Sequence, residues 1–344
     1  MIGDEQPVDP VKNILTFSDF CLDLHDDDGQ AYNLLDHISF AVPDGRALGV
    51  VGESGCGKSM TSLAAMRLLP PAAHISSGKI MLGDMDITAK SEKEMYEIRG
   101  KEMSMIFQEP MTSLNPVLTI GFQIEEMLIR HESNLTKAER RERVIDLLAK
   151  VGIPNPEKRL KSYPHEFSGG MRQRTMIAIA IACSPQLLIA DEPTTALDVT
   201  IQAQVLDLMM RLKQGGSLML ITHNLGVVAE VCEDVAVMYA GQIIESGPVK
   251  EVFLHPAHPY TQGLLRAIPM LNTTAKTLES IPGVVPTVQN FPKGCRYAPR
   301  CAYAKKECSQ ERPSRRDLGN GHDVACYLIE EESVTCRETN QFCK

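Results

Sequence analysis

Short apolar runs, each bounded by glycine or polar residues, recur along the chain. They are rich in aliphatic and β-branched side chains, and several are separated by segments with helical spacing. Each run therefore predicts a buried β-strand. The runs cover residues 46–51, 102–108, 186–193, 217–223 and 235–244.

Helical periodicity starts at Lys58, directly after a strand and a glycine loop, in the sequence KSMTSLAAMRLL. A second amphipathic stretch covers 198–216, and Gly215 ends it. Its apolar positions pack into a core: Ile201, Val205, Leu208, Met209 and Leu212. The alternation of strand, helix and strand predicts an α/β fold whose parallel sheet carries helices on both faces.

The stretch from about residue 112 to 167 has a different pattern. GFQIEEMLIRHES and TKAERRERVIDLLAKVG are amphipathic helices with no strand between them. This stretch predicts a helical insertion. Beyond about residue 250 the chain becomes rich in proline and then in cysteine, and it has little periodicity.

Composition narrows the class of protein. The 344 residues are 43% hydrophobic, enough for a sizeable core, and the net charge of −9 disfavours a nucleic-acid-binding protein. The first residues, MIGDEQPVDPVKN, lack the features of a secretory signal. No apolar run reaches the roughly 18 residues of a membrane-spanning helix. We expect a cytosolic chain that reaches a membrane only through a partner.

Residues 52–59, GESGCGKS, match the phosphate-loop pattern G-x-x-x-x-G-K-[ST]. Glycines allow backbone N–H groups to surround phosphate oxygens, and the helix that follows adds its positive end. Lys58 is placed for the β- and γ-phosphates and Ser59 for Mg²⁺. A plain glycine turn before a helix is the alternative. The residues predicted to bind the nucleotide here are Gly52, Ser54, Gly55, Cys56, Gly57, Lys58, Ser59 and Met60.

A second acidic element ends the strand LLIADE at residues 187–192. Asp191 is predicted to hold Mg²⁺, and Glu192 is predicted to act as general base toward water. The alternative is a solvated turn or a helix cap. His223 and Gln108 also end apolar strands, and composition alone assigns neither of them a role.

The stretch FSGGMRQR at 167–174 gives these residues a context. Together with GESGCGKS, IFQEP, LLIADEPTTALD and LITHN, in this order, it resembles the ATP-binding-cassette (ABC) ATPases from about residue 15 to 270. That family usually has LSGGQ. Met171 replaces the glutamine here, which removes one polar contact but keeps Ser168 and the glycines.

This resemblance implies a P-loop core with a parallel sheet, an antiparallel β part, a helical subdomain and a small cysteine-rich extension. The implied nucleotide-binding domain covers 1–270, with its helical subdomain at about 112–167, and the extension covers 271–344.

The resemblance also implies residue roles. Gln108 would bind Mg²⁺ and sense the attacking water, and His223 would contact the γ-phosphate. Two chains would form a head-to-tail dimer around two ATP molecules, with Asp198 at the seam. The helix start formed by Ser168, Gly169 and Gly170 would contact the partner's ATP. The family stacks an aromatic ring on adenine, and either His25 or Tyr32 stands near the right distance from the phosphate loop.

Within the family, GESGCGKS, EPMTSLNP, FSGGMRQR and HPAHPYT (255–261) resemble the peptide and nickel importers. A proline-stiffened turn is the alternative for HPAHPYT. The branch implies an ATPase on the cytoplasmic face of the inner membrane that drives uptake of di- or oligopeptides. Nickel or another solute, or a soluble ABC ATPase without transport, are the alternatives.

The same branch implies several partners. A second, different ATPase subunit would complete the dimer, and two permease subunits would dock near Gln108 and the helical insertion. An external solute-binding protein would deliver the solute.

Six of the ten cysteines follow residue 294, and a cytosolic location favours metal binding over disulfides. Their spacings of five, six and seventeen residues lack the paired pattern of zinc sites. By resemblance to the dipeptide importers, four of them would bind a four-iron, four-sulfur cluster: Cys295, Cys301, Cys308 and Cys326. Zinc and free thiols are the alternatives, and Cys336 or Cys343 are substitutes for the fourth ligand. We assign the cysteines no redox catalysis.

Cys56 lies inside the phosphate loop, where its expected role is to fill space. A thiol beside bound phosphate predicts an ATPase that is sensitive to bulky alkylating agents.

Overall fold

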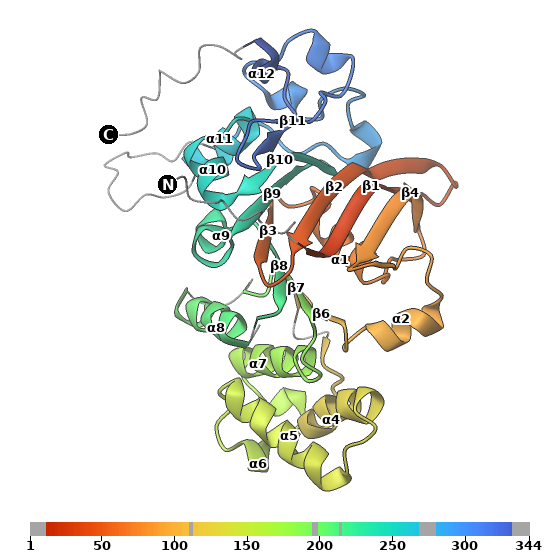
Figure 1. Ribbon diagram of the computed structural model, residues 1–344, viewed down its shortest axis with the longest axis vertical. Coiled ribbons are helices and arrows are strands. Elements are labelled where there is room, and N and C mark those ends of the chain that lie inside the picture. The colour runs from red at the N-terminus through yellow and green to blue at the C-terminus, as the bar shows by residue number, and fades with distance from the viewer. Residues whose placement is uncertain (1–11, 110–112, 195–198, 213–214, 268–279, 332–344) are drawn as a thin grey trace, which may run out of the picture.

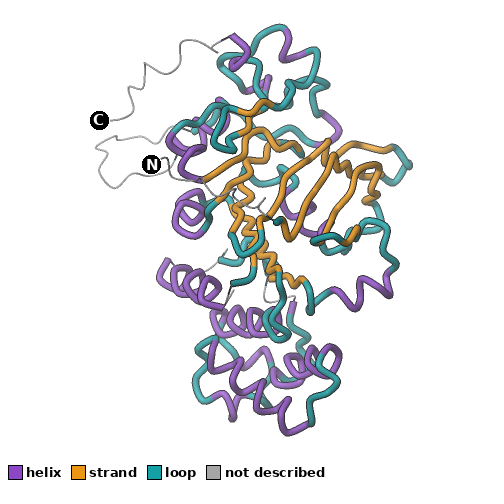
Figure 2. Tube along the Cα trace, viewed as in Figure 1, coloured by secondary structure: helices purple, strands orange, loops and turns teal. Residues whose placement is uncertain are grey.

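The structure, a computed structural model, describes residues 12–109, 113–194, 199–212, 215–267 and 280–331. Figure 1 shows three parts along the long axis: a helical body at the bottom, two sheets in the middle and a small extension at the top. The strands gather in the centre of the molecule (Figure 2).

The main sheet has eight strands in the order β11-β12-β10-β9-β3-β8-β7-β6, and its five strands from β9 to β6 are parallel. This confirms the predicted parallel sheet. The parallel strands are β3 (Ala47–Val51), β6 (Met103–Ile106), β7 (Leu187–Asp191), β8 (Ser217–Thr222) and β9 (Asp234–Tyr239). The antiparallel edge contains β10 (Gln242–Pro248), β11 (Arg316–Asp317) and β12 (Asp323–Val324).

The apolar run 235–244, predicted as one strand, is instead the hairpin of β9 and β10. Ala240 and Gly241 reverse the chain with φ angles of 45° and 79°. Any side chain at Gly241 would collide with the backbone oxygen of Leu34, so this turn packs tightly against β2. Apolar character alone does not distinguish one buried strand from two that are joined by a tight turn.

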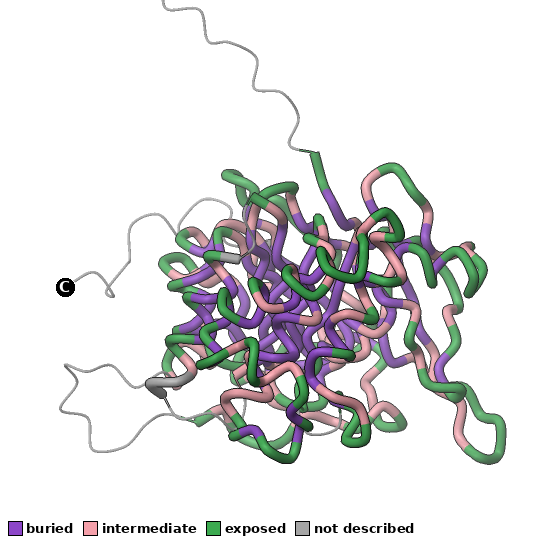
Figure 3. The backbone as a smooth tube through the Cα atoms, turned by 90° about the horizontal axis from the view of Figure 1, so that it is seen from below, coloured by how far each residue is buried: buried purple, intermediate pink, exposed green. Residues whose placement is uncertain are grey.

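Both faces of the parallel sheet are buried, which explains why its strands are continuously apolar. In β7, Leu188 and Ala190 pack into the core beneath the helices, whereas Leu187 and Ile189 point into the core shared with the second sheet. This alternation follows from the two-residue repeat of a strand. Figure 3 shows the buried residues filling the centre of the molecule.

The second sheet is antiparallel, with the order β2-β1-β4-β5, and confirms the antiparallel part of the fold. It packs its apolar face against the main sheet. The Asp36 N–H donates to the oxygen of Gly241, which ties β2 to the β9–β10 turn. The strands are β1 (Asn13–His25), β2 (Ala31–Pro43), β4 (Ala73–Leu82) and β5 (Met85–Asp86).

Between β6 and β7 the described residues form helices and no strand. Polar N-caps start these helices: Thr119 before α4, Thr136 before α5 and Ser168 before α7. Thr136 and Glu139 form a complete capping box. The helical body consists of α4 (Ile120–His131), α5 (Lys137–Lys150), α6 (Pro156–Arg159) and α7 (Gly169–Ala180).

The other helices pack around the sheets. They are α1 (Lys58–Ala65), α2 (Glu92–Ile98), α8 (Val199–Leu212), α9 (Leu225–Val231), α10 (Val249–Leu254), α11 (Pro259–Arg266) and α12 (Leu328–Glu331). Among the residues that the structure describes, no helix combines the length and the apolar character needed to span a bilayer.

The C-terminal extension is anchored to the cassette rather than separate from it. Strand β12 pairs with β10, with Val324 opposite Glu245, so the extension lengthens the main sheet. Arg296 is buried, and its guanidinium donates to the oxygen of Ala240 and to the Asn33 side chain on β2. The extension thus relies on the core of the cassette for much of its burial.

Candidate functional site

The phosphate-loop sequence forms the turn between β3 and α1. Gly55 and Gly57 have φ angles of 79° and 104°, which side chains rarely adopt. A Cβ on Gly57 would also lie 2.8 Å from a methyl carbon of Leu35. The Lys58 ammonium is buried, and it donates to the backbone oxygens of Gly52 at 2.8 Å and Glu53 at 2.9 Å. The loop therefore holds a cation against its own backbone, ready to pair with an anion.

Asp191 ends β7 beside the first turn of α1. Its two carboxylate oxygens accept hydrogen bonds from Ser59 at 3.1 Å and from Ser62 at 3.3 Å. Burial raises the pKa of Asp191 despite these two donors, and the neighbouring Glu192 adds to the effect. A buried carboxylate next to a hydroxyl offers the oxygen ligands that Mg²⁺ prefers. Sequence reasoning missed Ser62, although its position one helical turn after Ser59 gave a signal.

Gln108, Glu192 and His223 meet at the carboxyl ends of three adjacent parallel strands. The Gln108 amide donates to Oε2 of Glu192 at 3.3 Å, and His223 Nδ1 lies 3.4 Å from Oε1. Glu192 has a left-handed φ of 44°, which costs about 1–2 kcal/mol. Its N–H donates to the oxygen of Ile221 on β8, which fixes the strained turn. Ligand sites of parallel sheets lie at this edge.

The Ser168-Gly169-Gly170 segment is not part of this cluster. It starts α7 in the helical body, and Ser168 and Gly169 are exposed. Ser168 Oγ accepts a hydrogen bond from the N–H of Met171, whose side chain packs against the core. An apolar side chain at that position is therefore accommodated by packing.

Gln173 connects α7 to the strand end that carries Glu192, and sequence reasoning missed it. Its side chain is buried and donates to the oxygen of Pro193 at 2.7 Å, directly after Glu192. A polar residue inside an apolar helix was the signal in the sequence that could have identified it.

Asp198, predicted at the dimer seam, lies outside the described residues.

Cys56 is fully buried, and burial raises the pKa of its thiol. Its sulfur lies 3.8 Å from Lys58 Nζ, on the inner side of the loop. The expected sensitivity to bulky alkylating agents therefore loses its physical basis, because the reactive thiolate is both scarce and covered. Met60 lies in the first turn of α1 and is partly buried.

His25 and Tyr32 lie beside the turn that joins β1 and β2, at neighbouring register positions. The His25 ring contacts His74 at a centroid distance of 4.7 Å, while the Tyr32 hydroxyl interacts with Asp26. Adenine stacking by either residue stays a prediction.

The four cysteines of the extension line one narrow cavity, together with His258. Burial raises the pKa of Cys295 and of Cys326 to about 11 each. In the described ranges, no three of the four sulfur atoms lie within 4.8 Å of one another. A zinc ion bound to four thiolates would bring the sulfurs to about 3.8 Å apart. Which metal, if any, these thiols bind stays a prediction. Cys336 and Cys343 lie outside the described residues.

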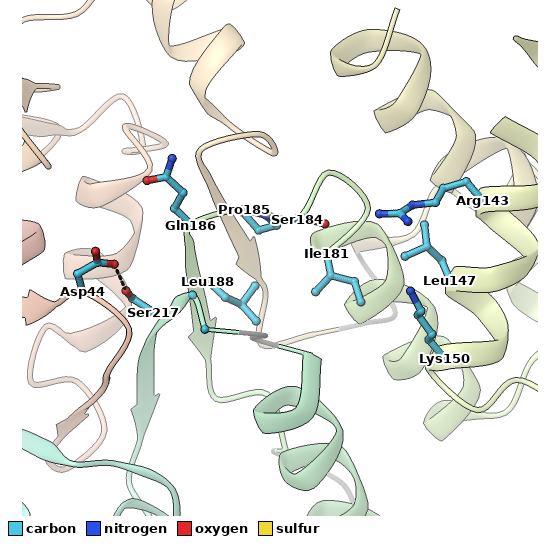
Figure 4. A pocket seen from close by; sticks show the side chains of 12 residues that line it. Asp44, Arg143, Leu147, Lys150, Ile181, Ser184, Pro185, Gln186, Leu188 and Ser217 are labelled. Atoms are coloured by element: carbon cyan, nitrogen blue, oxygen red, sulfur yellow. Dashed lines mark hydrogen bonds between the residues drawn. The ribbon is translucent and has the colours of Figure 1, made fainter. Parts of the chain in front are cut away.

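A cavity of about 470 Å³ lies at the opposite ends of the strands, between the sheet and α5 (Figure 4). Arg143 and Lys150 line its helical side, and Asp44 and Ser217 line its sheet side. None of the residues predicted to bind the nucleotide lines this cavity, so it is distinct from the phosphate site.

A phosphate loop, an acidic strand end and an exposed Ser-Gly-Gly helix start on this fold define an ATP-binding cassette. Residues 35–195 match the family described as ABC transporter, and residues 244–308 match the C-terminal region of oligopeptide/dipeptide transporters.

The chain is 53% identical over 303 residues to the oligopeptide transport ATP-binding protein AppD of Bacillus subtilis, covering 87% of this chain and 92% of AppD. It is 49% identical to the dipeptide transport ATP-binding protein DppD of Escherichia coli, covering 88% and 92%. The chain belongs to this family of ABC transporter ATP-binding proteins.

Solved structures agree on the fold. A dimeric ATP-binding cassette, MJ0796, bound to ADP and phosphate gives a TM-score of 0.61 at 23% identity, covering 68% of this chain and 98% of that one. The cbiO1 subunit from Clostridium perfringens gives 0.59 at 26% identity, covering 71% and 92%.

Proposed function

We propose that this chain is the ATP-hydrolysing subunit of a membrane importer that takes up di- or oligopeptides. The observation that carries the catalytic part is the meeting of Gln108 and His223 on the two oxygens of Glu192, next to Asp191. Four separate strand ends converge there, counting the phosphate loop after β3. The solute class follows from the peptide transport proteins that the chain resembles over most of its length.

Each residue of the site has a separate role in the proposed ATP hydrolysis. Lys58 gives up its hydrogen bonds to the backbone oxygens of Gly52 and Glu53 and contacts the β- and γ-phosphates of ATP instead. Ser59, Asp191 and Gln108 are the oxygen donors for Mg²⁺, which supplies charge neutralisation on those phosphates. Glu192 accepts the proton of the attacking water, and His223 donates to the γ-phosphate. The other predicted nucleotide contacts come from the loop backbone.

The second half of the ATP site comes from a partner cassette. Ser168 and Gly169 are exposed, and a side chain at Gly169 would meet no atom within 4 Å, so this helix start is open to a ligand. A helix N-terminus with free N–H groups attracts phosphate. A head-to-tail dimer places this surface on the partner's γ-phosphate, and the branch of the family favours a different ATPase subunit as partner.

Two permease subunits dock on the helical body. Several large apolar side chains are exposed near Gln108 and on α4, including Phe122 and Ile129, which lie seven residues apart on one helix face. Exposed apolar residues in one region are typical of a protein interface. The remaining members of this group are Phe107 and Val117. This docking places the chain on the cytoplasmic face of the inner membrane, with a solute-binding protein on the other side.

A four-iron, four-sulfur cluster in the extension is part of the same proposal. Four thiols line one cavity, and this grouping of candidate ligands supports the proposal. Thiolate ligands of a cluster would cross-link a segment that has few apolar residues of its own.

Nickel transport gains no support from HPAHPYT as a ligand set, because His258 is buried and its Nδ1 accepts a hydrogen bond from the Tyr260 N–H.

Reconstitution tests the proposal. The chain is co-expressed with two permease subunits and a second ATPase subunit, and the complex is placed in vesicles with a solute-binding protein. ATP-dependent uptake of a labelled tripeptide that disappears with Glu192→Gln is the expected result. Uptake of nickel without peptide uptake, or ATP hydrolysis by a chain that joins no permease, would contradict it.

A further inference from the structure

Two side chains from the C-terminal part of the chain meet the phosphate loop at one residue, Glu53. The Glu53 N–H donates to the hydroxyl of Tyr260, in the stretch HPAHPYT, at 2.8 Å. The Arg300 guanidinium binds both carboxylate oxygens of Glu53, at 2.6 Å and 3.1 Å. Neither Tyr260 nor Arg300 lies in the part of the chain that matches ABC transporters in general.

Arg300 is held rigidly in its own segment. Its side chain is 5% exposed, and it donates to the backbone oxygens of Pro282 at 2.8 Å and Gly283 at 3.2 Å. Burial alone would lower its pKa, but hydrogen bonds to Glu53 and Tyr239 raise it overall. A planar guanidinium that is already ordered loses little entropy when it binds a carboxylate with both nitrogens.

The charge of Glu53 makes this pair relevant to the nucleotide. A carboxylate on the phosphate loop repels the triphosphate, because both groups are negatively charged and lie close together. Arg300 neutralises that carboxylate. In addition, the Glu53 backbone oxygen accepts from Lys58, so fixing Glu53 also fixes the residue that holds the lysine.

We propose that Arg300 is a positioning residue for ATP, through which the C-terminal extension neutralises and orders the phosphate loop at Glu53. This inference rests on the proposed ATPase function. Arg300 directly precedes Cys301, whose thiol lines the four-cysteine cavity, so order in the extension is transmitted to the nucleotide site through adjacent residues.

The test compares Arg300→Ala, Glu53→Gln and the double variant in the full chain. Binding of a fluorescent ATP analogue and steady-state hydrolysis are both measured. Arg300→Ala should raise the KM for ATP about tenfold and leave kcat within about threefold. Glu53→Gln should change KM by less than threefold. The double variant should bind ATP nearly as well as Glu53→Gln alone, because no carboxylate remains to be neutralised.

Lys306→Ala is the matched control, since Lys306 is an exposed cation in the same extension. It should leave KM unchanged. If Arg300→Ala does not fold, Arg300→Lys keeps the charge without the two-nitrogen contact and should raise KM about threefold, again reversed by Glu53→Gln.

Additive losses in the double variant, or an unchanged KM in Arg300→Ala, would overturn the role of Arg300. A wild-type chain that fails to bind or hydrolyse ATP would instead overturn the proposed function itself.

Discussion

His223 Nδ1 lies 3.4 Å from Oε1 of Glu192, while Gln108 donates to the other oxygen of the same carboxylate. Glu192, the proposed general base, is thus oriented from both sides. The strained backbone of Glu192 points the carboxylate toward these two partners. Preorganisation of this kind lowers the free energy needed to reach the geometry in which water is deprotonated.

Replacing Glu192 by glutamine should reduce ATP turnover by several orders of magnitude and leave ATP binding intact. The amide keeps the shape of the side chain and its contact with Gln108 but cannot accept a proton from water. Single-turnover hydrolysis and size-exclusion chromatography with ATP check this prediction, and ATP-trapped dimers are expected. Glu97→Gln, an exposed change on α2, is the control. Turnover similar to that of the wild type would remove Glu192 from its role.

Asp191→Asn should abolish Mg²⁺-dependent ATP binding without destabilising the nucleotide-free protein. Burial raises the native pKa of Asp191, so its stabilising contribution is full at low pH and is lost as pH rises through that pKa. At neutral pH the buried charge costs free energy that asparagine avoids. Thermal unfolding with and without Mg-ATP measures both effects.

We expect an unfolding free energy for Asp191→Asn that is equal to the wild-type value or higher by about 1 kcal/mol. The exposed change Asp207→Asn serves as control, because its partner Arg211 is also exposed. A marked loss of stability in the nucleotide-free Asp191→Asn variant would contradict the burial argument.

Bulky maleimides should modify Cys56 slowly in the folded protein. The thiol has no exposed surface, and its raised pKa keeps it protonated at neutral pH. Mass spectrometry of the modified cysteine, followed alongside ATPase activity, should show loss of activity no faster than global unfolding. Rapid modification of Cys56 with the fold intact would show that the loop opens readily.

Cys301→Ser should lower the iron and acid-labile sulfide content of protein purified without oxygen, and should also lower the melting temperature of the extension. Removal of one thiolate from the four-cysteine cavity would leave the proposed cluster short of a ligand. Cys183→Ser is the control, because Cys183 lies in the helical body and its thiol donates to the oxygen of Met127. Colourless wild-type protein without iron would refute the cluster.

Local patterns were sufficient for most elements of the cassette. The strand of Asp191 and the helix after the phosphate loop were predicted because their periodicity and glycine content are local properties. The hairpin at Ala240 was missed, since its reversal depends on a close approach of Leu34 from β2. Buried polar partners such as Gln173 were also missed, because their hydrogen bonds join segments far apart in the chain.

The sequence by itself determined which residue types are available for nucleotide binding. The phosphate loop, the acidic strand end and the Ser-Gly-Gly helix start are each a short continuous stretch of residues. Only the tertiary structure decided which distant side chains act together. The parallel order of β6, β7 and β8 brings Gln108, Glu192 and His223 to one edge. The pairing of the extension with the cassette places Arg300 on Glu53, 247 residues away. Such contacts depend on how sheets and helices pack, and no local pattern encodes that packing.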